Sequence, residues 1–288
     1  MASPDSANPE PYSSKICCKA TAERYSQFRP QYPQQVYDII LQHLGPEQRE
    51  LAVDVATGSG QAAVQLAAFF KQVIATDGNE EQLRHAKPAA NVTYKFSDAH
   101  SIQLQNGYAD LITAASALHW FEHDRFYRET RRVLKPHGVL AAWAIPLGCA
   151  TLEVPSAPGA AAACNAALLH IHEGILKPCW DERKRWADKM YKGIEPSSEH
   201  FSSVQLMQLD FPVELTAEAL VGYASSWSAY SIYRKQHPDR PDPLVEYRQQ
   251  LLAALEAEGA PAGATIVAHI PLCMVLAQHP KPLHSSGS

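Results

Sequence analysis

Two glycines near the start of the apolar part of the chain carry the clearest chemical signal. Gly58 and Gly60 follow the apolar run 51–55 and precede a helical stretch, so they lie where the chain must turn tightly. Such a turn lets the backbone approach a bound nucleoside. Together with Ala63 the glycines also match the spacing G-x-G-x-x-A of a dinucleotide-binding turn. The turn therefore predicts a nucleoside cofactor without identifying it.

Two carboxylates flank this turn. Asp77 closes the next apolar run, where an acid can accept both hydroxyls of a ribose, as both NAD and S-adenosylmethionine require. Asp54 precedes Gly58, and its charge suits a cofactor with an ammonium and a sulfonium but would repel a pyrophosphate. The pair favours S-adenosylmethionine, with NAD as the alternative. An ordinary turn cap is the structural alternative for Asp54.

Polar residues also follow the third and fourth apolar runs. Asp98 follows the third, where a carboxylate can accept the exocyclic amine of adenine, and a solvated loop acid is the alternative. His119 and Trp120 follow the fourth. We take His119 as the candidate catalytic residue, because an imidazole can accept a proton or donate a hydrogen bond. Trp120 is a candidate wall of the substrate site, although such aromatic residues are often core.

Further aromatic and basic residues are candidates for binding the methyl acceptor. Tyr25, Arg29 and Tyr32 precede the first predicted helix, and Arg29 would be a natural clamp for a carboxylate. Trp227 lies in a later aromatic-rich stretch. Surface packing is the alternative for Tyr25, Arg29 and Tyr32. The pair His170 and His172 does not have the spacing of a metal motif, so we expect no metal site.

Short apolar runs alternate with helical stretches, which is the pattern of a parallel sheet covered by helices. The predicted strands are 51–55, 72–76, 92–96, 109–114, 139–143, 204–211 and 265–277. The predicted helices are 34–44, 61–70, 80–86, 124–134, 160–176, 181–191, 217–223 and 243–258. We therefore expect an α/β fold with a seven-stranded, mostly parallel, doubly wound sheet of the Rossmann-like type. It would have a late antiparallel strand and a helical insertion.

This pattern predicts one domain over 15–280. The expected divisions are a tail 1–14, a core 46–144, a helical insertion 145–199, C-terminal strands and helices 200–280, and a tail 281–288.

Composition narrows the class of partner. The net charge is −5, with charged residues at 19%, so no overall positive field exists to hold a nucleic acid. The six cysteines have neither CxxC spacing nor the density of a disulfide scaffold, and no signal peptide or membrane-spanning run stands out. We expect a cytoplasmic monomer or homodimer acting on a small molecule.

Taken together, these motifs resemble the class I S-adenosylmethionine methyltransferases. Details resemble the trans-aconitate methyltransferase group and its plant and fungal relatives. The resembling segments are 25–33, 54–61, 117–121, 132–138 and 225–230. Ala56 is a departure, because many relatives have glycine there.

The resemblance implies roles for individual residues. Asp54 would lie near the methionine part of the cofactor, Asp77 would bind the ribose, and Asp98 with Ala99 would meet the adenine. Tyr25, Ala56, Gly58, Gly60 and Ala115 would complete the cofactor site. The resemblance also suggests O-methylation of a carboxylate, with the acceptor undefined. The alternatives are an NAD-dependent oxidoreductase and a non-catalytic binding protein with this fold.

Overall fold

The computed structural model describes residues 28, 29 and 31–282. The expected tail 1–14, most of the tail 281–288 and Tyr25 lie outside this part. Within it, eight strands form one sheet in the order β3-β2-β1-β4-β5-β8-β6, and β7 pairs with the other side of β8. The strands are β1 (Leu51–Val55), β2 (Gln72–Asp77), β3 (Val92–Phe96), β4 (Ala109–Ala115), β5 (Leu134–Ala144), β6 (Thr151–Glu153), β7 (Phe201–Leu215) and β8 (Ile266–Pro280).

The strand directions confirm the predicted fold. β1 to β5 pair in parallel, and β8 runs antiparallel to β5. β8 pairs with β7 along nearly its whole length, while its other side meets β6 first and then β5. The seven expected strands are present, and the three-residue β6 adds an eighth inside the segment expected to be purely helical.

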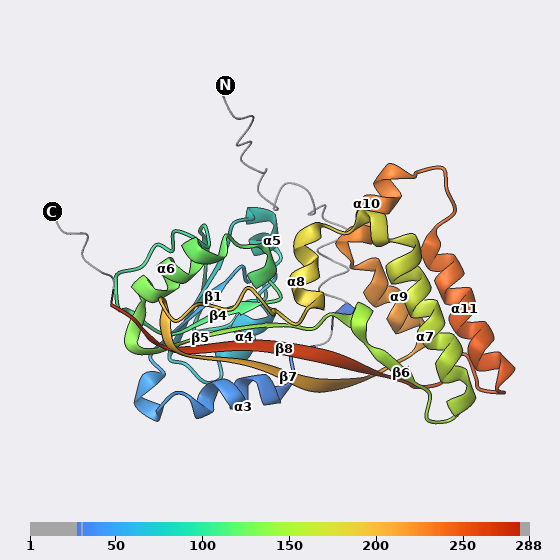
Figure 1. Cartoon of the computed structure of the whole chain (residues 1–288), viewed down its shortest axis with the longest axis horizontal. Helices are drawn as coiled ribbons and strands as arrows, with labels where there is room; N and C mark the ends of the chain where they lie inside the picture. Colours follow the sequence, from blue (N-terminus) through green and yellow to red (C-terminus); the bar gives the residue numbers. More distant parts are fainter. Residues whose placement is uncertain (1–27, 30, 283–288) are drawn as a thin grey trace, which may run out of the picture.

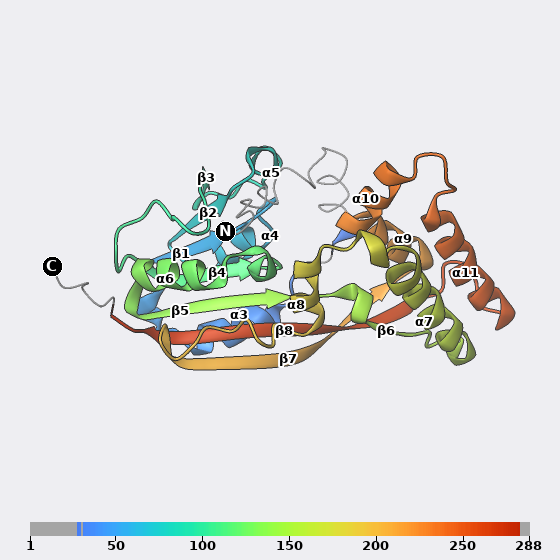
Figure 2. The same ribbon diagram turned by 45° about the horizontal axis from the view of Figure 1, so that its top comes forward.

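Helices cover both faces of the sheet (Figure 2). The α-helices of the described residues are α3 (Gln34–Gln42), α4 (Gln61–Leu66), α5 (Glu80–Arg84), α6 (His123–Val133), α7 (Ala161–Leu169), α8 (Arg185–Asp188), α9 (Ala217–Ser225), α10 (Ser228–Gln236) and α11 (Pro243–Ala257). Alternate strand residues point to opposite faces, so Ala52 packs in the core with α3 and α4, whereas Val53 packs in the core with α6. The helices turn a buried face toward the sheet. In α6, for example, the buried residues recur at helical spacing.

Four helices, α7, α9, α10 and α11, lie at one end of the molecule, beside the half of the paired strands β7 and β8 that adjoins β6 (Figure 1). We call these four helices the helical lobe. α11 begins at Asp242, whose carboxylate accepts the backbone N–H of Leu244 at 2.9 Å, and Pro243 occupies the first helical position. Buried residues of α7, α9 and α11 belong to the same core as the α3 and α4 face of the sheet. The lobe is therefore packed onto the end of the sheet.

The second half of the chain differs most from the prediction. The helix expected over 160–176 is α7 followed by a π-helical turn, η5 (His170–Ile175). The helix expected over 181–191 is reduced to the 3-10 turn η7 (Glu182–Lys184) and the four-residue α8. α10 was not predicted, because only Ala229 and Ile232 among its nine residues are aliphatic. Among the described residues, no helix combines the length and the apolar character needed to cross a membrane.

Candidate active site

The candidate site lies at the carboxyl edge of the parallel strands, where the strand order reverses. The chain proceeds from β1 outward to β2 and β3 and then returns to β4 on the other side of β1. In open α/β sheets, ligands bind outside the carboxyl ends of strands at such a reversal. The residues that end or follow β1 to β4 meet at this edge: Asp54, Ala56, Asp77, Asp98 and Ala115.

Asp54 is a fully buried carboxylate next to this edge. The hydroxyls of Thr57 and Thr113 donate to its two oxygens at 2.5 and 2.6 Å. Burial raises the pKa of Asp54 to about 6, although these two hydrogen bonds act in the opposite direction. No ion pair reaches Asp54 from the described residues. In this part of the chain its negative charge is stabilised by hydrogen bonds and not by a cation, which suits a bound cation.

The turn after β1 has a backbone that few side chains tolerate. Ala56, Gly58 and Gly60 all have positive φ, at 53°, 57° and 81°. A Cβ at Gly60 would collide with the hydroxyl of Tyr94, which donates to the Lys87 carbonyl at 2.6 Å. Glycine is thus required at position 60 by both the backbone and its neighbour.

Ala56→Gly should stabilise the protein by up to about 1 kcal/mol. A left-handed backbone costs a residue with a Cβ roughly 1–2 kcal/mol, which exceeds the entropy that glycine adds to the unfolded chain. Chemical denaturation would measure this difference. Ala52→Gly is the control, since Ala52 is buried within the extended strand β1 and its loss should destabilise. Destabilisation by Ala56→Gly would show that the Ala56 methyl group makes contacts that outweigh its backbone strain.

Asp77 holds the same turn from the end of β2. Its carboxylate accepts the backbone N–H groups of Gly58 and Asn79, each at 2.8 Å. Burial raises the pKa of Asp77 despite these two hydrogen bonds. The structure therefore brings Asp77 and Gly58 into direct contact, as expected for two parts of one site.

Asp98 follows β3 and is more open, with 59% of its side chain exposed. Ala99 follows it and is partly buried. Burial works against the charge of Asp98, but hydrogen bonds from His100 lower the pKa of its carboxyl below the usual range. Asp98 therefore presents a stable negative charge beside the exposed end of β3.

The segment after β4 carries His119. Ser116 has a positive φ of 54°, and the turn η2 (Leu118–Trp120) follows. Nδ1 of the buried His119 lies 3.3 Å from the Tyr191 hydroxyl, which also lies 3.3 Å from the Trp143 carbonyl. Burial lowers the pKa of His119 to about 3, and Lys184, His123 and Arg183 add to the effect. His119 is a neutral hydrogen-bonding group and a weak base at neutral pH.

Hydroxyl groups and a guanidinium lie between α9 and the end of β4. Arg29 donates to Ser226 Oγ at 3.1 Å and to the Tyr223 hydroxyl at 3.0 Å, and its guanidinium lies 4.5 Å from the Tyr223 ring centroid. The Tyr32 hydroxyl donates to Ser116 Oγ at 3.4 Å. Two of the sequence-predicted substrate residues, Arg29 and Tyr32, are thus anchored to α9 and to the end of β4.

The two predicted tryptophans lie in different surroundings. Trp120 is next to His119, with ring centroids 4.6 Å apart, and its ring is 5.3 Å from the Arg183 guanidinium. Trp227 is only 4% exposed and packs against His172, Trp180 and Tyr223 in the helical lobe. Tyr223, which also contacts Arg29, links Trp227 to the edge.

Several residues of this site were not predicted. Thr113 is the one that the sequence signals most, because it and Asp110 are the two polar residues of strand β4. Tyr191 and Tyr223 carry no such signal. Among the described residues, no group of three or more His, Cys, Asp or Glu could hold a metal ion. His170 instead pairs with Glu246, and His172 with Glu173.

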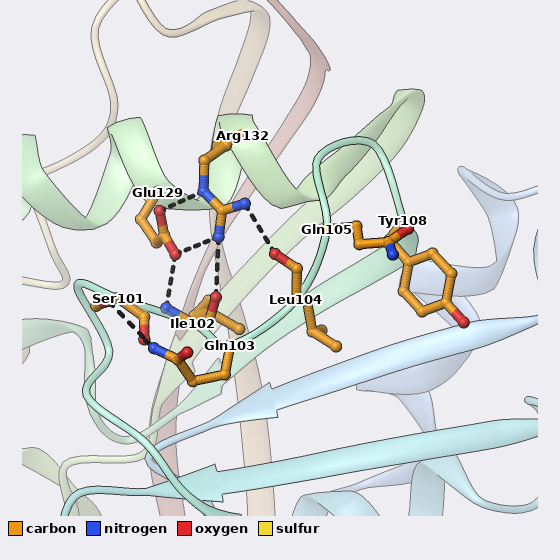
Figure 3. A pocket seen from close by; sticks show the side chains of 8 residues that line it. All are labelled: Ser101, Ile102, Gln103, Leu104, Gln105, Tyr108, Glu129 and Arg132. Carbon is orange, nitrogen blue, oxygen red and sulfur yellow. Dashed lines mark hydrogen bonds and ion pairs between the residues drawn. The ribbon is translucent and has the colours of Figure 1, made fainter.

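A hollow of about 600 Å³ lies away from this edge, between α6 and the loop that leads to β4 (Figure 3). Its polar groups are used within the protein. Arg132 donates to Glu129 and to the carbonyls of Ile102 and Leu104, and Glu129 accepts the N–H of Ile102 at 2.6 Å. Arg132 thus holds the loop that leads to β4 in place against α6. We assign no ligand to this hollow.

Comparison with known proteins gives consistent matches. A methyltransferase domain family model matches residues 53–142. A protein of Dictyostelium discoideum named as a methyltransferase is 33% identical over 257 residues, covering 89% of this chain and 92% of its own. A protein of Saccharomyces cerevisiae named as an S-adenosylmethionine-dependent methyltransferase is 23% identical over 244 residues, covering 76% and 82%. A solved structure from Anaeromyxobacter dehalogenans, described as a type II methyltransferase, has a TM-score of 0.70 at 30% identity and covers 87% and 98%.

Proposed function

This chain belongs to the S-adenosylmethionine-dependent methyltransferases, and from that premise we propose that it methylates a carboxylate oxygen of a small organic acid. The supporting observation is the weak basicity of His119. Burial lowers the pKa of this histidine to about 3, and the nearby Lys184 and Arg183 add to the effect while Asp181 opposes it. The resemblance to the trans-aconitate methyltransferase group suggests the same acceptor class.

The donor set fits S-adenosylmethionine. When bound, this cofactor supplies a methyl group on a sulfonium, which a nucleophile displaces in line. We propose that the buried charge of Asp54 attracts the ammonium and sulfonium, and that Asp77 accepts the ribose hydroxyls. Asp98 and Ala99 would bind the adenine.

Small residues would let the cofactor approach the backbone closely. The positions concerned are Ala56, Gly58, Gly60 and Ala115. We also propose Tyr25 as a cofactor contact, although it lies outside the described residues. The relatives described above are all methyltransferases, which favours the sulfonium cofactor over NAD.

The weak basicity of His119 favours an acceptor that is already ionised. Moving a proton from a phenol with a pKa of about 10 to a group with a pKa of about 3 costs about 10 kcal/mol. A carboxylate needs no such transfer at neutral pH. It needs hydrogen-bond donors that hold it in line with the methyl group, and Arg29 and Tyr32 would provide them, with Trp120 and Trp227 shaping the site.

We further propose that the protein works in the cytoplasm as a monomer or homodimer, on a small molecule rather than a nucleic acid. The net charge of −5 supports the small molecule over the nucleic acid.

The test is a panel of acceptors offered with S-adenosylmethionine. Mono-, di- and tricarboxylic acids are compared with phenols, amines and thiols, and mass spectrometry follows S-adenosylhomocysteine and the methylated product. Methyl esters that mild alkali hydrolyses would support the proposal. Arg29→Gln should then raise KM for the acid, while Arg248→Gln, which removes an exposed ion pair to Glu218, should not. Turnover of phenols or amines with no acid turned over would overturn the acceptor class and leave the family unchanged.

His119→Ala should leave cofactor affinity unchanged and lower kcat, because His119 contacts Tyr191 on the acceptor side of the edge. At saturating cofactor, kcat should be flat between about pH 6 and 8, because a group with a pKa of about 3 does not titrate there. Stopped assays across this range would measure both effects. A rising limb near pH 6.5 that His119→Ala abolishes would instead identify His119 as a general base.

A further inference from the structure

The imidazole of His100 bridges two loops at the carboxyl edge. On one side, its Nδ1 lies 2.8 Å from Asp98 Oδ1, and its own backbone N–H donates to the same oxygen at 2.9 Å. On the other side, its Nε2 accepts the backbone N–H of Glu122 at 3.0 Å. Glu122 is the N-cap residue that immediately precedes α6. His100 thus connects the loop after β3 with the segment after β4.

This bridge fixes the protonation pattern of the ring. The Glu122 backbone N–H can only donate, so Nε2 of His100 must carry a lone pair. In the neutral ring the proton then lies on Nδ1, which donates it to Asp98. Packing holds the ring in place, since the Phe121 ring meets it edge to face with centroids 5.9 Å apart. The His100 side chain is only 14% exposed, whereas that of Asp98 is 59% exposed.

The two donations from His100 fall on one oxygen of Asp98. Within the described residues, no hydrogen bond reaches the other oxygen, Oδ2. A carboxylate that is held by one oxygen and open at the other can accept one N–H group with a defined direction. The exocyclic amine of adenine is a group of this kind.

We infer that His100 is a positioning residue that orients Asp98 toward the adenine amine and ties it to the segment that carries His119. The inference rests on the role of Asp98 given under the proposed function. It adds a consequence: His100 couples the position of the loop that carries Asp98 to the position of the segment that carries His119. A cofactor without the amine would gain little from this arrangement.

The test compares two product analogues that differ only at this amine. S-adenosylhomocysteine carries it, and S-inosylhomocysteine has a carbonyl in its place. Calorimetric titration of the full chain, with no acceptor present, gives the ratio of the two affinities. The ratio is independent of which acceptor the enzyme uses, so failure of the carboxylate proposal would not affect it.

We expect the unmodified chain to prefer S-adenosylhomocysteine by roughly tenfold or more, as for one hydrogen bond to a charged group. His100→Ala should reduce that preference several-fold. His100→Gln should retain most of it, because an amide can donate and accept across a similar span. His170→Ala is the matched control, since His170 also pairs with a carboxylate, that of Glu246, but in the helical lobe.

The decisive readout is the ratio, which a loss of general stability would not change. If His100→Ala weakens both analogues equally, His100 has only a structural role and the inference fails. It fails as well if Asp98→Asn keeps the full preference, because Asp98 would then not read the amine.

Discussion

At pH 7.5 the ligand-free Asp54→Asn variant should unfold at a higher temperature than the unmodified protein, while its affinity for S-adenosylmethionine should fall at least tenfold. The amide that replaces the carboxylate keeps the size of the side chain and can still bond to the hydroxyls of Thr57 and Thr113. The substitution removes a buried charge whose pKa is raised to about 6 from the usual value near 4. That difference corresponds to up to about 3 kcal/mol of unfolding free energy at neutral pH.

The sign of the effect follows from linkage. Because the folded protein binds the Asp54 proton more tightly than the unfolded chain, this group favours folding below about pH 4. That contribution is lost as the pH rises to about 6. The unmodified protein should therefore lose stability over this interval, and Asp54→Asn should lack that loss. Thermal unfolding measured from pH 4.5 to 8 would show the difference.

Asp110→Asn provides the matched control. Asp110 is also buried in the central sheet, but it pairs with Lys135 at 2.7 Å and accepts the backbone N–H of Leu51 at 3.0 Å. Its neutralisation should destabilise the protein and leave cofactor affinity unchanged, because it leaves Lys135 without its partner. If Asp54→Asn also destabilises at pH 7.5, the charge of Asp54 is compensated by a further interaction, and the stability part of the prediction is wrong.

Asp77→Ala should weaken S-adenosylmethionine binding by about 1.5–3 kcal/mol, or roughly 10- to 150-fold. Two losses combine here: the proposed contact to the ribose, and the hydrogen bonds that hold Gly58 and Asn79. The affinities for S-adenosylmethionine and S-adenosylhomocysteine should fall by similar factors, because both carry the same ribose. Calorimetric titration of the two ligands would test this.

A control must distinguish a direct loss of cofactor binding from a general loss of protein stability. Asp242 likewise accepts a backbone N–H, that of Leu244, and it also accepts the Tyr230 hydroxyl at 2.8 Å. Asp242→Ala should therefore cost about 1 kcal/mol of stability at the start of α11 and leave cofactor affinity intact. Unchanged affinity in Asp77→Ala would mean that the ribose binds elsewhere.

The inner strands of the sheet were predictable because β1, β2 and β4 are buried along nearly their whole length. All five residues of β1 are buried and four of them are apolar, so this run is enough to locate it. The turn at Gly58 and Gly60 and the acids at strand ends are local signals, and parallel topology alone brings them to one edge. Those parts of the site could be identified from sequence.

The acceptor side could not be identified in the same way, because its contacts join residues that are far apart in the chain. Arg29 binds Tyr223, 194 residues later. Tyr191 lies after α8 in a segment with little periodicity, yet it meets His119. No local pattern encodes such pairs, since they exist only once distant segments of the chain pack together.

The position of β8 has a consequence for how the chain acquires its structure. β8 lies between β5 and β7, and both are synthesised before it. Until residues 266–280 emerge from the ribosome, the adjacent edges of β5 and β7 stay open and can pair with other nascent chains. The cofactor edge of β1 to β4 can form earlier from local βα units, whereas closure of the sheet must wait for this strand. Substitutions in β8 should therefore lower the yield of folded protein during synthesis more than they change the chemistry of the finished enzyme.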